Sequence, residues 1–456
     1  MDHSWSFVID FTLLSLLMVV SAILKARIPL LRKIIVPTSM VAGILGLLVG
    51  PELLGWLQFD IDRLGQLVYH LMAVGFIALS LKEREVTNSP AVMRSGMLIV
   101  STYLIQGLVG FGLLLLLTEL FYPGMFPGIG LLLPLGYGQG PGQAYSIGSR
   151  WEALGLEGGG NLGLTIAGFG FIWAVIPGII LMNFLIRHPK FKQAAASGSH
   201  KERTEVTEKS EEGEIPLSDA IDKLTYQIAL IGFIYLVTYI TLRGLEAVLT
   251  PLGTYGETLA QLLIGFHFLI GSLYAMLFRW ILNRWKQAGF QLEHSPNNYL
   301  LQRISGFSFD YMIAASIAAI SIYALKQYLT PVLILTTVGG LVTVWFMVWL
   351  VPRVLPEDKL PNILGFYGML TGTISTGLAL VKAVDPKFQS NTTDNLVMGS
   401  ASAIMFGFPL LLILNIPIVG YLQNQPMMYL YTFAALFLYF VILLGVLLYR
   451  SRKAAA

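Results

Sequence analysis

The stretch LLLPLGYGQGPGQAYSIGSRW, residues 131–151, determines the fold class that the sequence predicts. It carries a glycine at every second position from Gly136 to Gly142, with Pro141 among them. Each interior glycine costs a helix roughly 0.5–1 kcal/mol relative to alanine, so this density disfavours a continuous helix. The stretch lies between two long apolar runs, at membrane depth, where irregular backbone persists only inside protein or along a wet cavity. We therefore predict a re-entrant loop that contacts substrate.

The composition is that of a polytopic membrane protein. The 456 residues are 55% hydrophobic and only 12% charged, whereas soluble domains carry about 25% charged residues. The mean hydropathy is +0.71. The chain contains no cysteine, which excludes disulfides, thiolate metal sites and cysteine nucleophiles. The N-terminal sequence MDHSWSFVIDF lacks the features of a signal peptide, so the first apolar run is predicted to be a retained span.

Apolar runs long enough to cross about 30 Å of hydrocarbon recur along the chain. They lie at roughly 6–24, 35–56, 65–81, 95–121, 158–186, 225–249, 257–283, 304–327, 330–352, 393–420 and 427–449. These runs predict about eleven spans. Two shorter segments, at roughly 126–148 and 361–382, are rich in small and hydroxyl residues and are not expected to cross.

The charges of the loops predict the topology. Lys and Arg gather in alternate loops, which the positive-inside bias assigns to the cytoplasm. These residues are Lys25, Arg27, Arg32, Lys33, Lys82, Arg84, Arg94, Arg187, Lys190, Lys192, Arg279, Arg284, Lys286, Arg303, Arg353, Lys359, Arg450, Arg452 and Lys453. All loops agree if the N-terminus is outside, the C-terminus is inside, and each short segment returns to the side from which it enters.

The same order of segments occurs twice. Residues 1–186 give four spans, a re-entrant loop at about 126–148 and one further span, and residues 225–420 repeat this order with a loop at about 361–382. Because five spans is an odd number, the second unit has the opposite orientation, an arrangement known from secondary transporters. Residues 187–224 are predicted to be a cytoplasmic linker, and residues 421–456 an additional C-terminal transmembrane helix with its tail. The expected fold is therefore all-α, with two inverted repeats.

The second polar segment, PNILGFYGMLTGTISTGLALV at 361–381, is rich in hydroxyl groups. Hydroxyl and carbonyl oxygens suit Na⁺, while bare backbone N–H groups suit a carboxylate. Small residues at this spacing also serve close helix packing, which is the structural alternative. Two such segments in equivalent places of inverted repeats favour the functional interpretation.

Three stretches carry a resemblance to known transporters: VPTSMVAGILGLLVG (36–50), GYGQGPGQAYSIGSRWEALGL (136–156) and GFYGMLTGTISTGLALV (365–381). They resemble the glutamate:sodium symporters of bacteria, the ESS family, and more distantly the citrate:sodium symporters of the 2-hydroxycarboxylate family. The first loop reads GQGPGQ where the family usually has Ser-Gly-Gly-His-Gly-Thr, and TGTISTG replaces an Ala-Thr-Pro-Thr pattern. The chain thus resembles a divergent member. The resemblance implies a homodimer, an elevator-like displacement and a place in the bacterial inner membrane.

We expect sodium-coupled symport of glutamate or a related small carboxylate by alternating access. Proton coupling and an anion channel are the alternatives; no enzyme activity, nucleic-acid partner or cofactor other than the coupling ion Na⁺ is expected. The predicted substrate-binding residues are Gln139, Gly140, Gly142, Gln143, Ala144, Tyr145, Arg150, Thr371, Thr373, Ser375 and Thr376. The predicted Na⁺ ligands are Thr373, Thr376, Asp310 and Asn395. Asp310 is included because ionisable groups inside a span are costly and usually functional, although pairing with Arg303 is the structural alternative.

Overall fold

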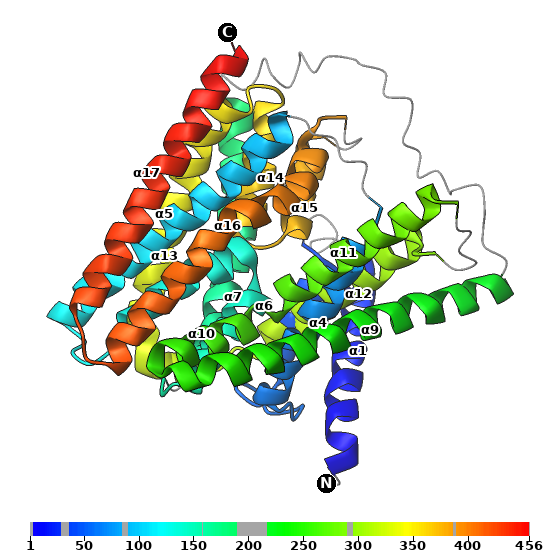
Figure 1. The fold of residues 1–456 in the computed structure, drawn as a ribbon, viewed down its shortest axis with the longest axis horizontal. Coiled ribbons are helices and arrows are strands. Elements are labelled where there is room, and N and C mark those ends of the chain that lie inside the picture. The colour runs from blue at the N-terminus through cyan, green and yellow to red at the C-terminus, as the bar shows by residue number, and fades with distance from the viewer. Residues whose placement is uncertain are drawn as a thin grey trace. The chain divides into compact units, whose positions relative to one another are not determined.

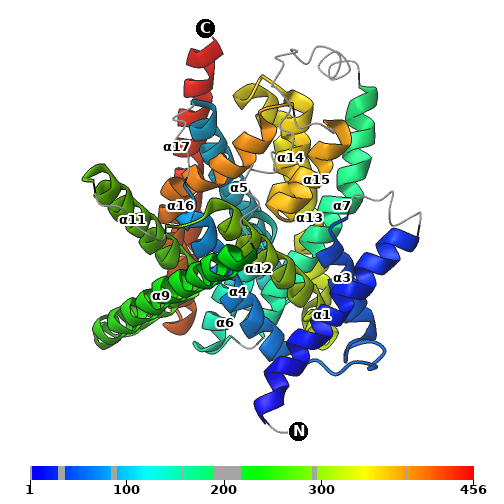
Figure 2. The same cartoon turned by 90° about the vertical axis from the view of Figure 1, so that its right-hand side faces the viewer.

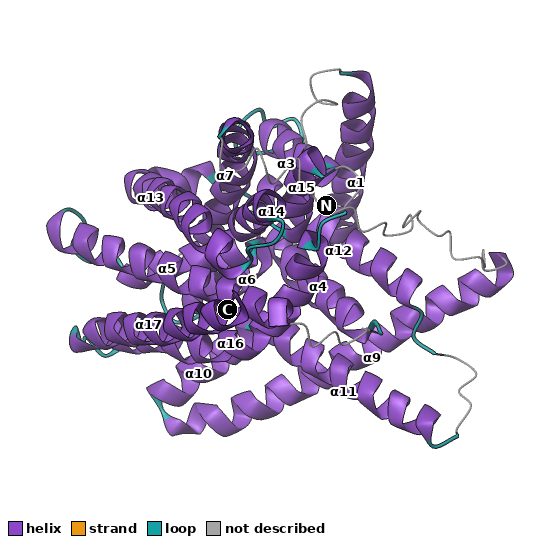
Figure 3. Ribbon diagram, turned by 90° about the horizontal axis from the view of Figure 1, so that it is seen from above, coloured by secondary structure: helices purple, strands orange, loops and turns teal. Residues whose placement is uncertain are grey.

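The computed structural model describes residues 3–28, 36–83, 90–156, 158–188, 217–289, 295–385 and 389–455. Every element in these ranges is a helix (Figure 3). Eight of the described helices are long and apolar enough to cross a membrane, or nine when a bent pair counts as one span. The chain is therefore a multi-pass membrane protein with an all-α fold.

The described helices lie on both sides of the predicted linker. Those before the predicted linker are α1 (His3–Arg27), α3 (Thr38–Val49), α4 (Ile61–Leu81), α5 (Pro90–Leu120), η1 (Pro127–Leu131), η2 (Pro134–Gln139), α6 (Pro141–Glu152) and α7 (Gly159–Arg187). Those after it are α9 (Leu217–Leu249), η3 (Thr250–Leu252), α10 (Thr254–Gly265), α11 (His267–Gln287), α12 (Asn298–Ala318), α13 (Ile322–Val354), α14 (Lys359–Thr371), α15 (Ile374–Val384), α16 (Thr392–Leu422) and α17 (Met427–Ala455) (Figure 1).

Three of the eleven predicted spans differ from single long apolar helices. Helix α3 has 12 residues, about 18 Å of helix, which is shorter than the hydrocarbon layer. Helix α12 carries Arg303 and Asp310 and is not among the eight. The run at 257–283 is broken at Phe266, where α10 and α11 meet at a bend of 63°. The count of eleven spans therefore stays a prediction.

Much of the predicted linker lies outside the described residues. Residues 189–216 are not described, and residues 217–224 form the first turns of α9. Five of the basic residues that predict the topology, Arg32, Lys33, Arg84, Lys190 and Lys192, also lie outside the described residues.

The helices form two compact units. Unit 1 comprises Met1–Gln66, Thr87–Gly198 and Ile313–Ala456, and unit 2 comprises Leu67–Val86 and Ser199–Met312. Unit 1 therefore combines helices from both halves of the sequence, including both polar segments.

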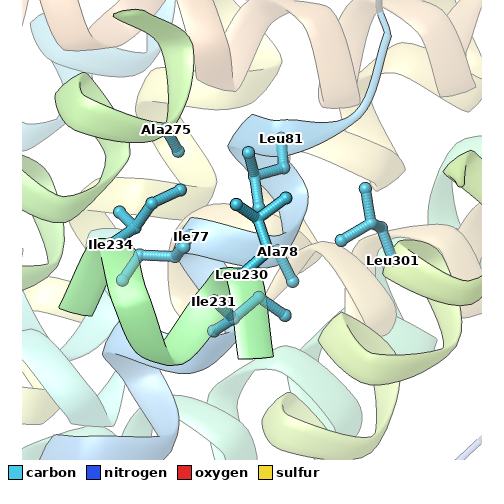
Figure 4. Close-up of a cluster of buried hydrophobic side chains, with 8 residues drawn as sticks. All are labelled: Ile77, Ala78, Leu81, Leu230, Ile231, Ile234, Ala275 and Leu301. Carbon is cyan, nitrogen blue, oxygen red and sulfur yellow. The ribbon is translucent and has the colours of Figure 1, made fainter. Parts of the chain in front are cut away.

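The core of unit 2 is a cluster of buried aliphatic side chains from α4, α9, α11 and α12. They are Ile77, Ala78, Leu81, Leu230, Ile231, Ile234, Ala275 and Leu301 (Figure 4). Lipid tails are as apolar as leucine, so close packing rather than exclusion of water holds such helices together in a bilayer. This packing explains why the members are branched or small side chains that fit against one another.

Helices α6 and α7 of unit 1 approach each other through glycines. A Cβ placed on Gly148 would lie 2.1 Å from the carbonyl oxygen of Gly159, and one on Gly163 would lie 2.4 Å from that of Ala144. No real Cβ atom tolerates such distances, so only glycine permits this contact. The close packing fixes α6, the helix that follows the glycine run, against the spanning helix α7.

This contact predicts that Gly148→Ala destabilises the protein. The added methyl group would overlap the backbone of α7, and overpacking of this kind costs about 1–3 kcal/mol. The matched control is Gly445→Ala on α17, where a Cβ meets nothing within 4 Å. Thermal unfolding of the purified protein should show a lower Tm for Gly148→Ala and an unchanged or higher Tm for the control. Equal changes in Tm for the two variants would contradict the close contact between α6 and α7.

Candidate functional site

The glycine run at 136–142 forms a broken helix. Helix η2 ends at Gln139, Gly140 adopts φ 107° and ψ 173°, and α6 begins at Pro141. A φ of this value suits glycine because a Cβ would clash with the backbone. Proline is favoured at the first position of a helix, because an N–H group there would have no partner within the helix. The dipeptide Gly140-Pro141 thus encodes a break followed by a helix start.

The segment around this break folds back on itself. The rings of Phe126 and Trp151, which lie at its two ends, meet edge to face with centroids 5.5 Å apart. The break at Gly140 is about midway between them. Residues 126–152 therefore form a helical hairpin with its tip at Gly140, called the first hairpin below.

Helices α14 and α15 form a second hairpin, residues 359–384, with its tip at Gly372. A Cβ on Gly368 would lie 2.9 Å from the Cα of Gly377, and one on Gly365 would lie 2.9 Å from a methyl group of Val381. Residues before the tip thus pair with residues after it in reverse order, so the two helices are antiparallel. Figure 2 shows them side by side. The glycines of this segment serve mainly to bring the two helices together.

Gln106 of α5 joins the two tips. Its Nε2 donates hydrogen bonds to the carbonyl oxygen of Leu370 and to Oγ1 of Thr343, each at 2.9 Å. A Cβ on Gly138, in the first hairpin, would lie 3.0 Å from its Oε1. Leu370 and Gly138 each lie two residues before a tip. One side chain therefore touches both hairpins next to their breaks.

Gly170 of α7 marks a second meeting point of the hairpins. A Cβ there would lie 2.4 Å from the carbonyl oxygen of Thr371 and 2.9 Å from the ring of Tyr137. The hydroxyl of Tyr137 donates a hydrogen bond of 2.8 Å to the carbonyl oxygen of Thr336 on α13. The two tips thus converge between α5 and α7 within unit 1.

The convergence leaves polar groups available to a ligand. Gln106 is fully buried, and its Oε1 accepts no hydrogen bond from the part of the chain that the structure describes. An unpaired buried acceptor costs about 1–3 kcal/mol. In α6 the first helical hydrogen bond runs from Ala144 to the carbonyl of Gly140, so the helix does not use the N–H groups of Gly142 and Gln143. Such a helix N-terminus attracts anions.

Most predicted residues of the first segment lie at its tip. Gln139, Gly140, Gly142, Gln143 and Ala144 surround the break, and Gln143 is buried, with its Oε1 3.8 Å from the position of a Cβ on Gly140. The structure therefore brings these five residues together at the tip, and their contact with substrate stays a prediction.

Tyr145 and Arg150 lie farther along α6. The ring of Tyr145 packs where a Cβ on Gly65 of α4 would be, 2.3 Å away, and also contacts Gly160. Arg150 is in the last turn of α6, roughly ten residues or about 15 Å from the break. The structure therefore separates Arg150 from the tip residues with which the sequence groups it.

Glu152 closes the base of the first hairpin, at the end of α6 and outside the spanning helices. Its Oε1 accepts a hydrogen bond of 2.7 Å from the N–H of Gly160. Burial raises the pKa of Glu152 above its ordinary value, the Gly160 bond opposes this rise, and the charge of Asp62 adds to it. The protonated form of Glu152 thus favours the folded state, and this contribution to the free energy of unfolding is lost as pH rises through the folded pKa of Glu152.

Hydroxyl groups of the second tip are largely engaged within the hairpin. Thr371 is buried, and its Oγ1 donates to the carbonyl of Tyr367 at 2.7 Å. Oγ1 of Thr376 accepts the N–H of Thr373 at 2.8 Å and lies 2.7 Å from the carbonyls of Gly368 and Thr373. Ser375 is exposed. In this conformation Thr371 and Thr376 stabilise the hairpin, while Ser375 faces outward.

The structure brings together two of the four predicted Na⁺ ligands. Thr373 and Thr376 meet at the second tip, whereas Asn395 bonds Asn362 at 3.3 Å, roughly ten residues or about 15 Å along α14 from the break. Asp310 is exposed on α12, in unit 2. No group of three or more His, Cys, Asp or Glu side chains able to hold a metal ion occurs among the described residues.

Comparisons of the chain with family models, with curated proteins and with solved structures found no match.

Sequence reasoning missed Gln106 as the residue that links the tips. It stands in the long apolar run of α5, and a buried polar side chain in such a run is costly enough to indicate a partner. That signal is present in the sequence, but it does not say which segments the partner comes from. Thr343 of α13 was missed for the same reason.

Replacing Gln106 with leucine should loosen the second hairpin. The carbonyl of Leu370 would lose its donor, at a cost of about 1–3 kcal/mol. Leucine also removes the unpaired Oε1, which offsets part of this cost, so we expect a small change in Tm but clearly faster amide hydrogen exchange in α14. Gln287→Leu, an exposed position at the end of α11, is the matched control and should change neither quantity. Unchanged exchange in the Gln106 variant would rule out the link.

Proposed function

We propose that the protein is a secondary active transporter that couples entry of Na⁺ to uptake of a small carboxylate, with glutamate as the leading candidate. One observation carries the proposal: two helical hairpins, each broken at its tip, converge on Gln106. Interrupted helices inside a membrane protein supply backbone donors and acceptors to substrates and ions. Alternating access then opens such a site first to one side of the membrane and then to the other.

Inverted repeats fit the order of the helices. The first unit runs α1, α3, α4, α5, first hairpin and α7, and the second runs α9, α10 with α11, α12, α13, second hairpin and α16. We propose that the hairpins are re-entrant segments that enter from opposite sides, with the N-terminus outside and the C-terminus inside. The alternation of basic loops supports this topology. The homodimer and the elevator-like displacement rest on the resemblance to the ESS family.

The polar groups of the site suit an α-amino acid. The N-terminus of α6 offers N–H groups and a partial positive charge to a carboxylate. Oε1 of Gln106 is an unpaired acceptor next to Gly138, and it suits an ammonium group. A substrate that carries both groups satisfies both partners, whereas a citrate-like anion offers the acceptor a neutral hydroxyl in place of a cation. The resemblance to glutamate:sodium symporters supports the same choice.

The second tip supplies the oxygen atoms that suit Na⁺. The carbonyls of Gly368 and Thr373 lie within 2.7 Å of Oγ1 of Thr376. A hard cation prefers such oxygens, and a broken helix exposes carbonyls that a continuous helix would use. We propose that Na⁺ binds here after a small opening of the hairpin.

Uptake into proteoliposomes tests the coupling. Labelled glutamate should accumulate under an inward Na⁺ gradient, saturate with concentration and exchange with unlabelled glutamate. Accumulation driven by a proton gradient without Na⁺ would replace sodium coupling with proton coupling. Flux that neither saturates nor exchanges would indicate an anion channel.

Gly140→Ala should reduce uptake about tenfold. A positive φ destabilises a residue that has a Cβ by roughly 1–2 kcal/mol, and each 1.4 kcal/mol changes an equilibrium constant tenfold. The nearest atom of another side chain would be 3.8 Å from the new methyl group, so the loss would come from strain in the backbone of residue 140 itself. Gly445→Ala controls for the substitution itself. Wild-type uptake by the Gly140 variant, at equal membrane level, would defeat the assignment of the tip.

A further inference from the structure

A basic pocket lies in unit 1 where the start of α5 meets the end of α17. It is lined by Pro90, Met93, Arg94, Arg450 and Lys453. The two helices run alongside each other in both side views (Figures 1 and 2). Three of the five lining residues are cations and none is an acid, so the pocket concentrates positive charge.

The cations are available for an anion. The Nε of Arg94 is buried and has no hydrogen-bond partner within the described ranges. Arg450 and Lys453 are exposed at the end of α17. A buried guanidinium N–H without an acceptor is costly, and phosphate oxygens match the arginine fork. The three cations around the pocket therefore favour an anionic oxygen as its ligand.

The surface next to the pocket favours a lipid over a free anion. The face of α17 that leads to it is apolar and exposed, with Leu438, Val441, Ile442, Val446 and Tyr449. Pro90 and Met93 add an apolar wall to the pocket itself. A free phosphate would use only the cations, whereas a phospholipid would use the cations and this apolar face together.

We propose that this pocket binds the phosphate headgroup of an anionic phospholipid, whose acyl chains lie along α17. The basic loops predict this end of α17 at the cytoplasmic surface, where basic pockets between transmembrane helices hold anionic lipid headgroups. The site is separate from the tips of the hairpins and does not depend on the proposed transport function.

Native mass spectrometry of the full chain tests the proposal. Protein in a mild detergent would be titrated with phosphatidylglycerol or with phosphatidylcholine of the same acyl chains. We expect phosphatidylglycerol to bind the wild type and to bind the variant Arg94→Gln/Arg450→Gln/Lys453→Gln at least about tenfold more weakly, since each cation near a membrane surface contributes about 1 kcal/mol. Phosphatidylcholine should show no such difference.

The control removes the same charge elsewhere, in Arg452→Gln/Arg284→Gln/Lys286→Gln, whose residues do not line the pocket. It should bind phosphatidylglycerol like the wild type. Equal binding by both triple variants would overturn the proposal. Displacement of the lipid by millimolar inorganic phosphate would overturn it too, because the pocket would then be a site for a free anion. A matching Tm for the two variants without lipid shows that the comparison is not one of folding.

Discussion

The constraint on which the rest of the structure depends is that a bilayer offers no partner to an unpaired backbone group. A helix broken at membrane depth must therefore hide its break inside protein. Here two breaks, at Gly140 and Gly372, lie in one unit, with residues next to each bordering Gln106. The surrounding helices α5, α7 and α13 supply the cover, and the hydrogen bond from Gln106 to Leu370 satisfies one carbonyl that the break at Gly372 frees.

Glycine serves two purposes in these hairpins. Gly140 is required by its backbone conformation, because its φ is 107° while the space around it is open. Gly148, Gly368 and Gly377 are required by contact, because a Cβ on each would lie less than 3 Å from another backbone atom. The first kind forms the tip and exposes backbone donors, and the second kind holds the hairpin against its neighbours. A glycine-rich sequence between apolar runs thus encodes both a break and the packing that protects it.

The sequence predicted the helical class, an interruption of regular helix within the glycine run of the first segment and the helical character of most apolar runs. Glycine periodicity at 136–142 and Pro141 carry that information locally. It did not predict that the hydroxyl groups of Thr371 and Thr376 form hydrogen bonds to backbone carbonyls within the second hairpin. Those hydrogen bonds depend on how the chain folds back. Nor did it separate Arg150 from the tip, since residues near in sequence can lie at opposite ends of a helix. The role of Gln106 could not be predicted either, because it depends on how α5 packs against both hairpins.

The central claim is that the two tips form one site for a carboxylate and Na⁺. Because the chain has no native cysteine, Ser375→Cys places a single thiol at the exposed position of the second tip. The rate of its labelling by a small maleimide should fall when glutamate and Na⁺ are added together, and Gln287→Cys at the exposed end of α11 should be labelled at a constant rate. A labelling rate at the tip that ignores glutamate and Na⁺ would contradict the account.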